Sequence, residues 1–452
     1  MEVIFKNIKL EKIIGKNYCE INLNDNNWEF TRFCIEKKVK EGVLIYNSLI
    51  GSMILLDNDE YNNISDNTDV LQYLIDNFYV SNDNEYIESL ANKVQGFIRV
   101  HKPNRTYEKI NTVTILPSTG CNAKCFYCFE KGAMKKHMDY DTADKVIDYI
   151  IKHYNGKILK VRWFGGEPLI NEKIITYISE KLIENNINFV SNITSNCFLI
   201  SEDKINLYKD VWHLKRVSVT IDGTEDVYNN VKAFTYSGSA YKKVLDNILV
   251  LASHNFSISI RINVGDHNLD DVKKLIDELL LIFGDKKNVS IYLNRLYDNC
   301  GGAPDNNEEL SIVIKKIIQM TTYLAKHGKG GSRIKINRGF KTTQCMADSG
   351  GAVMILPDGK LGLCEHYMDD YHIGDIVNGV TDFENVKKCC EQVDKYDTCE
   401  KCPLFPTCTK LKICSGGVCT DETLIYTNFY IKKSMNKEYN KYKKVQHTAK
   451  MS

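Results

Sequence analysis

The chain has 452 residues, a formal net charge of +1 at pH 7 and an apolar fraction of 43%. That length predicts roughly two to four domains, and the apolar content excludes a wholly disordered chain. The near-zero charge argues against a nucleic-acid-binding surface, which usually needs a concentrated basic excess.

Residues 1–100 are predicted to form a self-contained α+β unit, because strand-like segments come first and helix-like segments follow. The expected strands are 3–14, 18–23, 30–38 and a pair within 43–56 that breaks at 47–51; the expected helices are 67–78 and 85–94. A polar linker, 101–111, follows this unit.

Strand-like and helix-like runs alternate through the central segment, 112–330. The strand-like runs are 112–116, 158–164, 188–194, 217–221, 257–264 and 289–294. The helix-like runs are 142–154, 173–186, 242–254, 268–281 and 308–327. Repeated strand–helix units imply parallel strands with helical crossovers. The predicted fold class is therefore α/β, with an open, partial (β/α)6 barrel instead of the closed eight-stranded one.

The chain contains 16 cysteines, and nine of them fall between Cys345 and Cys419. The opening sequence MEVIFKNIKL lacks an apolar core of signal-peptide length, and no apolar run approaches the roughly 18 residues of a membrane span. We therefore expect a cytoplasmic protein with no membrane partner, where thiols stay reduced and disulfides are rare. The cysteines are better interpreted as metal ligands.

Three cysteines, Cys121, Cys125 and Cys128, follow the first predicted barrel strand within eight residues. Three thiolates on one loop can bind three irons of a 4Fe–4S cube and leave the fourth iron open. A zinc site is the alternative, but zinc usually takes four ligands from two pairs of cysteines, and no second pair lies nearby in the sequence.

The segment Cys121-Asn-Ala-Lys-Cys125-Phe-Tyr-Cys128 matches the Cys-x3-Cys-x2-Cys signature of radical S-adenosylmethionine (SAM) enzymes, including the aromatic residue before the last cysteine. This resemblance implies that SAM chelates the open iron. It also implies that one electron from the cluster cleaves SAM to methionine and a 5′-deoxyadenosyl radical, which abstracts a hydrogen atom from the substrate.

Further segments resemble the SAM-binding elements of this family. Gly165-Gly166-Glu167-Pro168 resembles the GGEP motif, whose carbonyl and carboxylate acceptors hold the SAM amino group. Other candidate contacts are Thr194, Ser195 and Asn196 to the ribose, Ser218 or, preferably, Thr220 to the SAM carboxylate, and Arg261 as a carboxylate-binding fork. A simple Gly-rich turn is the alternative for the first segment, and a structural ion pair is the alternative for Arg261.

The C-terminal cysteines in segment 331–425 resemble the SPASM domain of radical SAM peptide-modifying enzymes, and 426–452 is expected to be a tail. The resemblance implies an outer auxiliary 4Fe–4S cluster and an inner one, three clusters in all. The implied outer ligands are Cys399, Cys402, Cys408 and Cys419, and the implied inner ligands are Cys345, Cys364 and Cys414.

The last spacings of this pattern depart from the family, so Cys414 and Cys419 could exchange roles. The fourth inner iron could be bound by Cys300, Cys389 or Cys390, or could stay open for a substrate thiolate. A pair of structural zinc sites is the alternative for the whole domain. The remaining thiols, Cys19, Cys34 and Cys197, fit no pattern and are predicted to be packed in the interior.

Glu365 follows Cys364 directly, as a catalytic carboxylate does in anaerobic sulfatase-maturating enzymes; a surface acid is the alternative. The N-terminal unit resembles, in pattern only, the winged-helix-like recognition elements that capture the leader of ribosomally made, modified peptides (RiPPs) by strand addition.

The implied function is RiPP maturation through Cys thioether crosslinks, as in sactipeptide and ranthipeptide synthases, with flavodoxin or ferredoxin as the electron donor. Carbon–carbon links, carbon–oxygen links and formylglycine formation are alternatives within this class. An electron-transfer protein and a zinc-stabilised peptide-binding module are alternatives from other classes.

Overall fold

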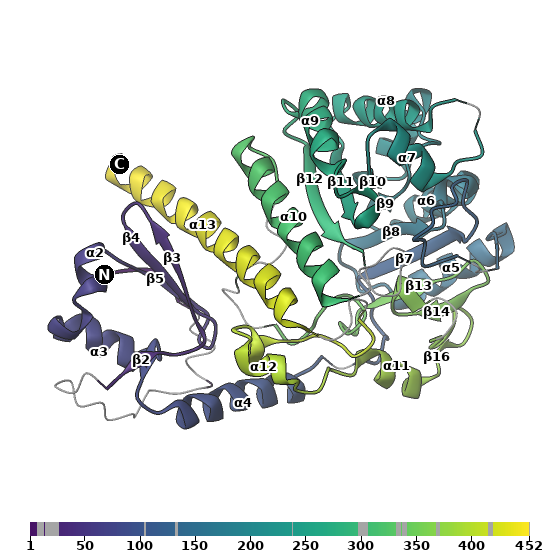
Figure 1. The fold of residues 1–452 in the computed structure, drawn as a ribbon. Coiled ribbons are helices and arrows are strands. Elements are labelled where there is room, and N and C mark those ends of the chain that lie inside the picture. Colours follow the sequence, from purple (N-terminus) through teal and green to yellow (C-terminus); the bar gives the residue numbers. More distant parts are fainter. Residues whose placement is uncertain are drawn as a thin grey trace.

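The computed structural model describes residues 1–6, 13, 27–103, 105–131, 134–236, 238–296, 306–330, 336, 341–367, 371–414 and 419–451. The predicted strand 18–23 and the end of the predicted strand 3–14 lie outside these ranges. Figure 1 shows three parts along the chain: an N-terminal α+β unit, a central sheet flanked by helices, and a C-terminal region that contacts both of the other parts.

The N-terminal unit contains a four-stranded antiparallel sheet in the order β1-β5-β4-β3 and a two-stranded sheet of β2 and β6. Its strands are β1 (Glu2–Phe5), β2 (Glu29–Phe30), β3 (Cys34–Val39), β4 (Gly42–Asn47), β5 (Ser52–Leu56) and β6 (Val80–Ser81). Its helices are α2 (Asn58–Asn62), η1 (Ile64–Asp66), α3 (Thr68–Asp76) and α4 (Asn84–Val100). The predicted strand pair and both predicted helices are therefore confirmed, with α4 longer than expected.

Strands β4 and β5 are buried along their whole length, so both faces of this sheet are covered. Because side chains alternate between faces, Ile45 and Ile54 pack into the core with α3 and α4, whereas Leu44 and Met53 pack with the C-terminal helix. The sheet is thus sandwiched between helices from opposite ends of the chain.

The central sheet begins with six parallel strands in sequence order, as the partial (β/α)6 barrel predicts. The strands are β7 (Thr112–Ser118), β8 (Leu159–Gly165), β9 (Phe189–Thr194), β10 (Leu214–Thr220), β11 (Ser257–Val264) and β12 (Val289–Arg295). The helices are α5 (Tyr140–His153), α6 (Glu172–Glu184), α7 (Glu225–Lys232), α8 (Ala240–Ser253), α9 (Val272–Phe283) and α10 (Asn307–Lys326). Short η2 (Pro168–Asn171), η3 (Glu202–Lys204), η4 (Leu207–Val211) and η5 (Asp266–Asn268) lie in the connections.

The same sheet continues past the predicted boundary at residue 330. Strand β13 (Ala352–Ile355) pairs in parallel with β7, and β14 (Lys360–Gly362), β15 (Gly374–Asp375) and β16 (Gly379–Val380) extend the sheet beyond it to ten strands. The C-terminal region also contains η6 (Glu365–Tyr367), α11 (Phe383–Cys390), α12 (Asp397–Lys401) and η7 (Phe405–Thr407). Hydrogen bonding to β7 therefore makes the Cys-rich region an extension of the barrel sheet.

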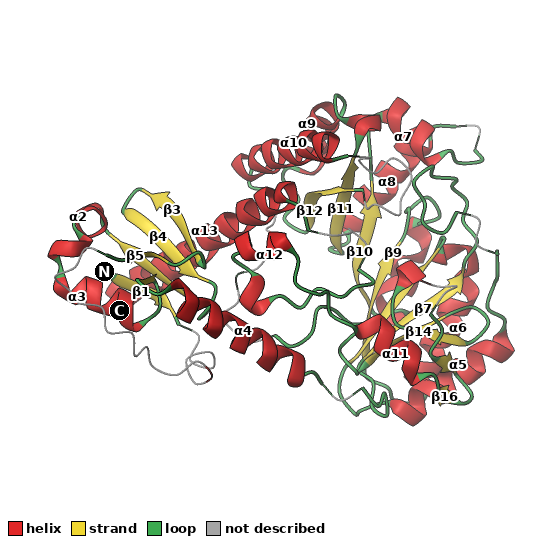
Figure 2. Cartoon of the chain, turned by 60° about the horizontal axis from the view of Figure 1, so that its bottom comes forward, coloured by secondary structure: helices red, strands yellow, loops and turns green. Residues whose placement is uncertain are grey.

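The predicted tail, 426–452, belongs instead to a 31-residue helix, α13 (Asp421–Met451). Figures 1 and 2 show α13 passing between the N-terminal sheet and α10. Ile431, Met435 and Tyr439 recur at four-residue spacing and are buried against the sheet, which explains why the helix forms. The many intervening Lys and Asn residues hide this stripe in the sequence. None of the helices among the described residues is both long enough and apolar enough to cross a membrane.

Candidate active site

The predicted SAM-binding residues meet at the carboxyl ends of the parallel strands. Because these ends share one edge of the sheet, the loops after β7, β8, β9 and β10 lie together. A cavity of about 540 Å³ opens there. The predicted site residues that line it are Cys121, Cys125, Cys128, Gly165, Gly166, Thr194, Ser195, Asn196, Thr220, Arg261 and Glu365.

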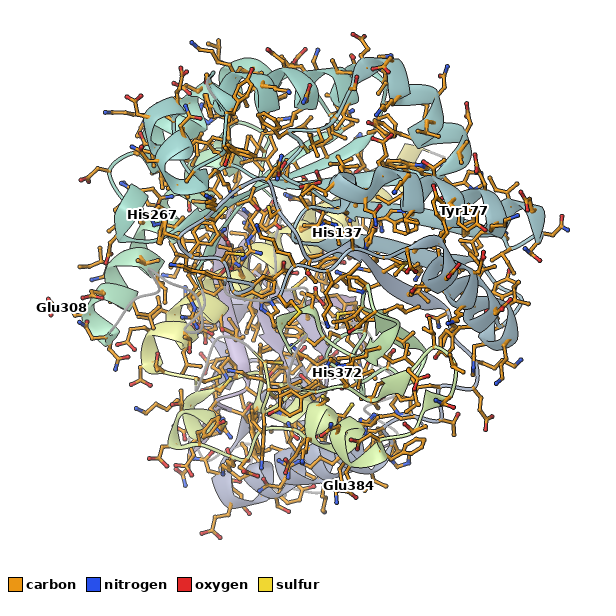
Figure 3. All side chains as sticks on the ribbon, turned by 90° about the vertical axis from the view of Figure 1, so that its right-hand side faces the viewer. His137, Tyr177, His267, Glu308, His372 and Glu384 are labelled. Carbon is orange, nitrogen blue, oxygen red and sulfur yellow. The ribbon has the colours of Figure 1, made fainter. Side chains whose placement is uncertain are left out.

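The cysteine loop leaves β7 and is folded back on that strand. His137, labelled in Figure 3, forms an isolated antiparallel bridge with Ser118, the last residue of β7. Thr119 Oγ1 also donates a hydrogen bond to the carbonyl oxygen of Met134 at 2.8 Å. These contacts close the loop that carries the three cysteines.

The three thiols of this loop suit a cationic group that carries several irons. Burial, together with smaller contributions from the neighbouring Glu167, Cys125 and Cys128, raises the pKa of the Cys121 thiol to about 12. Burial also raises the pKa of Cys128 to about 11. Iron would stabilise the thiolates that this crowding disfavours. Within the described ranges, no three His, Cys, Asp or Glu side chains form a site for a single metal ion.

The glycines at the end of β8, Gly165 and Gly166, allow the backbone there to contact the cysteine loop. Gly165 has φ +125°, and a Cβ atom there would lie 2.1 Å from the carbonyl oxygen of Ser118. A Cβ atom on Gly166 would lie 2.5 Å from the carbonyl oxygen of Gly120. Only glycine fits both positions, so the motif brings the backbone after β8 against the cysteine loop.

The carboxylate of Glu167 faces the protein interior, whereas the family resemblance predicts that it faces the SAM ammonium group. The side chain is fully buried and accepts hydrogen bonds from Ser195 Oγ at 2.9 Å, from the Asn196 backbone N–H at 2.8 Å and from the Leu169 backbone N–H at 3.1 Å. Burial raises its pKa to about 7, although these hydrogen bonds lower it. Three of the predicted SAM contacts, all within the described residues, do not line the cavity: Glu167, Pro168 and Ser218. Glu167 therefore joins the loops after β8 and β9.

A hydrogen bond joins two loops at the cavity, and three residues that were not named as site residues from the sequence also line it. Asn196 Nδ2 donates to Asn122 Oδ1 at 2.7 Å, which ties the loop after β9 to the cysteine loop. Tyr127, Lys232 and Asn263 also line the cavity. Tyr127 could have been found as the aromatic residue before the last cysteine, whereas only the fold brings Lys232 to this edge.

The implied inner cysteines lie close enough to influence one another. Burial raises the pKa of Cys345 to about 11 and that of Cys364 to about 12, and in each case Cys414 and Glu365 contribute to the rise. Asp348 is fully buried and accepts hydrogen bonds from the Gln344 and Cys345 backbone N–H groups, which fixes this loop.

The implied outer cysteines form a second group. Burial raises the pKa of Cys402 to about 12, and Cys408, Cys419 and Cys399 add to the rise. Cys414 thus interacts with the inner cysteines, and Cys419 interacts with the outer ones. Which cluster each of the two binds stays a prediction.

The other described cysteines include two candidates for the fourth inner ligand, and Cys390 Sγ lies 3.5 Å from the carbonyl oxygen of Ala347 in the loop of Cys345. Cys389 and Cys390 are buried on α11, and the charged groups near the Cys390 thiol include Arg105, Asp348 and Lys102. Cys197 is buried in the barrel core and Cys34 lies on β3. Cys19 and Cys300 fall outside the described residues.

Residues after Cys364 line the same cavity as the SAM motifs. Glu365 and His366 both line it. Glu365 forms an ion pair of 3.4 Å with Arg162 of β8, and the His366 ring packs on Phe129 with a centroid distance of 4.6 Å. The C-terminal region thus contributes side chains to the same cavity as the cysteine loop.

Comparison with known proteins agrees with this geometry. The radical SAM superfamily matches residues 115–279, which hold the cysteine loop and the glycine motif. The chain therefore contains a radical SAM domain. This domain implies SAM and one 4Fe–4S cluster as cofactors, which together would supply a 5′-deoxyadenosyl radical. Cys121, Cys125 and Cys128 are the residues that would hold the cluster.

Two curated relatives cover much of this radical SAM protein. It is 28% identical over 249 residues to the uncharacterized protein MJ0907 of Methanocaldococcus jannaschii, a match that covers 54% of this chain and 81% of the relative. It is 26% identical over 443 residues to the radical SAM cyclopropyl synthase TigE of Paramaledivibacter caminithermalis, covering 84% and 88% of the two chains.

Solved structures share the fold of this radical SAM protein. Native anSMEcpe with bound AdoMet and Kp18Cys peptide superposes with a TM-score of 0.55 at 13% identity, covering 74% of this chain and 99% of that one. Streptococcus suis SuiB bound to S-adenosylmethionine superposes with a TM-score of 0.50 at 14% identity, covering 90% and 99%.

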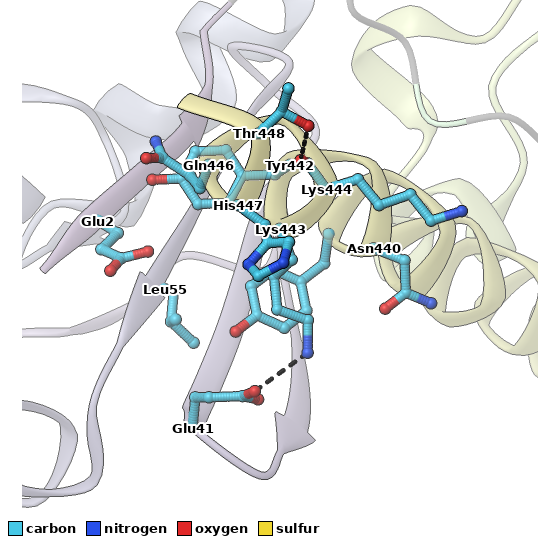
Figure 4. A pocket seen from close by; sticks show the side chains of 11 residues that line it. Glu2, Glu41, Leu55, Asn440, Tyr442, Lys443, Lys444, Gln446, His447 and Thr448 are labelled. Carbon is cyan, nitrogen blue, oxygen red and sulfur yellow. Dashed lines mark hydrogen bonds and ion pairs between the residues drawn. The ribbon is translucent and has the colours of Figure 1, made fainter. Parts of the chain in front are cut away.

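A second cavity, of about 1000 Å³, lies between the end of α13 and the N-terminal sheet (Figure 4). Its residues include Glu2, Leu55 and Lys444, and an ion pair of 3.0 Å between Lys443 and Glu41 joins its two sides. None of the predicted cluster ligands that the structure describes lines it.

Proposed function

We propose that this radical SAM enzyme modifies a ribosomally made precursor peptide and forms Cys thioether crosslinks. The observation that supports the proposal is the shared cavity, which is lined both by SAM-motif residues and by Glu365, next to the inner group Cys345, Cys364 and Cys414. Three inner cysteines leave one iron of a 4Fe–4S cluster for a substrate thiolate. A peptide cysteine bound there would lie beside the SAM site.

Thioether formation removes two hydrogens from the peptide. A carbon would lose a hydrogen atom to the 5′-deoxyadenosyl radical that SAM and the cluster held by Cys121, Cys125 and Cys128 would supply. The cysteine thiol would lose its proton, for which Glu365 is the candidate acceptor, and an iron–sulfur cluster would supply the acceptor for the remaining electron as the C–S bond forms.

Carbon–carbon bond formation is the second candidate. It is favoured by the relative TigE, a radical SAM cyclopropyl synthase aligned over 443 residues. Both reactions remove two hydrogens, so peptide mass alone does not separate them. Iodoacetamide labelling does: a thioether product has fewer free thiols than the precursor, whereas a product with a new C–C bond keeps all of them.

The N-terminal unit is the proposed site for the leader of the precursor. Its sheet ends in two edge strands, β1 and β3, as strand addition requires. Fluorescence anisotropy with labelled leader and labelled core peptides tests this. Tight binding of the leader alone supports it, and equal weak binding of both contradicts it.

The proposed location is a reducing cytoplasm with flavodoxin or ferredoxin as the electron donor. All 14 cysteines that the structure describes are free thiols, as expected where disulfides are rare.

Iron and acid-labile sulfide counts after anaerobic reconstitution test the proposed clusters. The wild type should hold about twelve irons, and the Cys121→Ala/Cys125→Ala/Cys128→Ala variant about eight, given four irons per cubane. About four falling to none would contradict auxiliary clusters. A colourless, zinc-loaded protein would support the peptide-binding module, and failure to form 5′-deoxyadenosine would support the electron-transfer alternative.

A further inference from the structure

A buried ion pair lies beneath the cysteine loop. Lys232, the last residue of α7, and Asp222, which follows β10, have side chains that are 6% and 0% exposed, and Lys232 Nζ lies 3.0 Å from Asp222 Oδ2. Removing two such charges from water is strongly unfavourable unless both are paired and hydrogen-bonded. A structural ion pair at this depth therefore needs compensating contacts.

Tyr127 and the neighbouring backbone supply these contacts. Lys232 Nζ donates to the Tyr127 hydroxyl at 2.6 Å, and that hydroxyl donates to Asp222 Oδ2. The other carboxylate oxygen of Asp222 accepts from the Asn263 backbone N–H at 2.9 Å. Both charges are thus paired and hydrogen-bonded, and the attraction to Asp222 and Tyr127 keeps the pKa of Lys232 well above its usual value although burial lowers it.

The same lysine forms hydrogen bonds with the cysteine loop on both sides of Cys125. Its backbone carbonyl accepts a hydrogen bond from the Lys124 N–H at 2.8 Å, and its side chain holds Tyr127. The Cys125 and Cys128 thiols are both among the groups that interact electrostatically with the Lys232 charge. Lys232 also lines the cavity at which these cysteines lie.

A fixed cation in this position favours additional negative charge nearby. Reduction adds one negative charge to an iron–sulfur cluster, and electrostatic attraction is strong where little water screens it. We propose that Lys232, held by Asp222 and Tyr127, is a positioning residue that raises the reduction potential of the cluster bound by Cys121, Cys125 and Cys128. The ion pair with Asp222 keeps the lysine charged. The hydrogen bond to Tyr127 keeps its ammonium group beside the cysteine loop.

The test is a redox titration of the reconstituted enzyme, without SAM, followed by electron paramagnetic resonance. The relevant signal is the one that the Cys121→Ala/Cys125→Ala/Cys128→Ala variant lacks. Lys232→Met should shift its midpoint potential to a more negative value, so that the ratio of reduced to oxidised cluster at the wild-type midpoint falls about tenfold, or 59 mV for one electron. Lys232→Arg should keep most of the wild-type potential, since it keeps the positive charge.

Lys145→Met is the matched control, because Lys145 is an exposed lysine of α5 and its loss changes the net charge equally. It should leave the potential unchanged. An unchanged potential in Lys232→Met with full iron content would overturn the proposal, and a weaker affinity for SAM alone would make Lys232 a SAM ligand instead.

If Lys232→Met loses iron, its potential cannot be compared with that of the wild type. The same titration is then made on Tyr127→Phe, which keeps the ring and removes only the hydroxyl. That variant should shift the potential in the same direction by a smaller amount. A loaded Tyr127→Phe enzyme with the wild-type potential would then overturn the proposal.

Discussion

Arg32 of the N-terminal unit donates from Nη1 to the backbone carbonyl oxygen of Cys399 at 3.1 Å, across 367 positions of the sequence. The same nitrogen lies 3.1 Å from the carbonyl oxygen of Cys402, and Gln95 Nε2 lies 3.0 Å from that of Cys408. Phe405, between these cysteines, is buried in the N-terminal core. The loop of the outer cysteine group is therefore built into the N-terminal unit, which is less self-contained than the sequence predicts.

Replacing Arg32 should weaken the contact between the N-terminal unit and the loop of the outer cysteine group. Arg32→Met removes the donors to both carbonyl oxygens and the ion pair with Glu88, a loss of about 1–3 kcal/mol for charged hydrogen bonds at a partly buried site. We expect a lower melting temperature and less iron per chain after reconstitution. Arg216→Met, at an exposed position of β10, is the control. Equal melting temperatures and iron contents in the two variants would contradict the expectation.

Gly165→Ala should abolish SAM binding without unfolding the protein. The added Cβ would meet the Ser118 carbonyl oxygen at 2.1 Å in a backbone conformation that disfavours side chains, so the loops after β7 and β8 must separate. Equilibrium dialysis with SAM measures the effect. Gly96→Ala in α4 meets no atom within 4 Å and should bind SAM normally, with a stability gain of about 0.5–1 kcal/mol. Normal SAM binding by Gly165→Ala would show that the close approach is dispensable.

Glu167 should make stability fall as the pH rises. Its folded pKa of about 7 lies above the ordinary value of 4.5, so its contribution is fully present below pH 4.5 and is lost as the pH passes 7. The loss is about 3 kcal/mol. Melting temperatures from pH 5 to 8 should therefore fall more steeply for the wild type than for Glu167→Gln.

The same substitution should weaken SAM binding. A glutamine offers one oxygen acceptor where the carboxylate serves Ser195 on one oxygen and the Asn196 N–H on the other. The loop after β9 should shift, and we expect roughly a tenfold higher Kd for SAM, equivalent to 1.4 kcal/mol. Parallel melting curves and an unchanged Kd would rule out this role.

Glu365→Gln separates base catalysis from SAM cleavage. Glu365 lines the cavity but belongs to the C-terminal region, so 5′-deoxyadenosine formation without peptide should be unchanged. Product formation with the peptide should fall about 10²- to 10⁴-fold, as for loss of a general base. Chromatography of the nucleoside and mass spectrometry of the peptide follow the two steps. Full product yield would leave Glu365 as a partner of Arg162 only.

Single cysteine variants should separate the two auxiliary groups. Cys414→Ala should perturb the inner cluster, because Cys414 interacts electrostatically with Cys345 and Cys364, and Cys419→Ala should perturb the outer one. Distinct changes in the electron paramagnetic resonance spectra would check the assignment. Cys197→Ala, in the barrel core, should keep the wild-type spectrum. Loss of the same signal in the first two variants would contradict two separate groups.

The sequence by itself determined the parts that depend on local order. Six strand-like runs alternate with helices, so the parallel sheet and its strand order follow from periodicity and short connections. The Cys121 loop and the Gly165–Gly166 pair follow strands directly, and strand ends of a parallel sheet meet at one edge. These residues line the cavity as expected.

Only the tertiary structure decided the relationships between distant segments. The carboxylate of Glu167 faces inward because Ser195 and Asn196, almost 30 positions later, supply its donors. Lys232 reads in the sequence as an ordinary lysine at a helix end, and its burial beside Asp222 depends on how α7 meets the cysteine loop. Helix α13 forms because its sparse apolar stripe finds the open face of the N-terminal sheet. Periodicity reports which side of an element is apolar, whereas the partner of that side is set by packing over the whole chain.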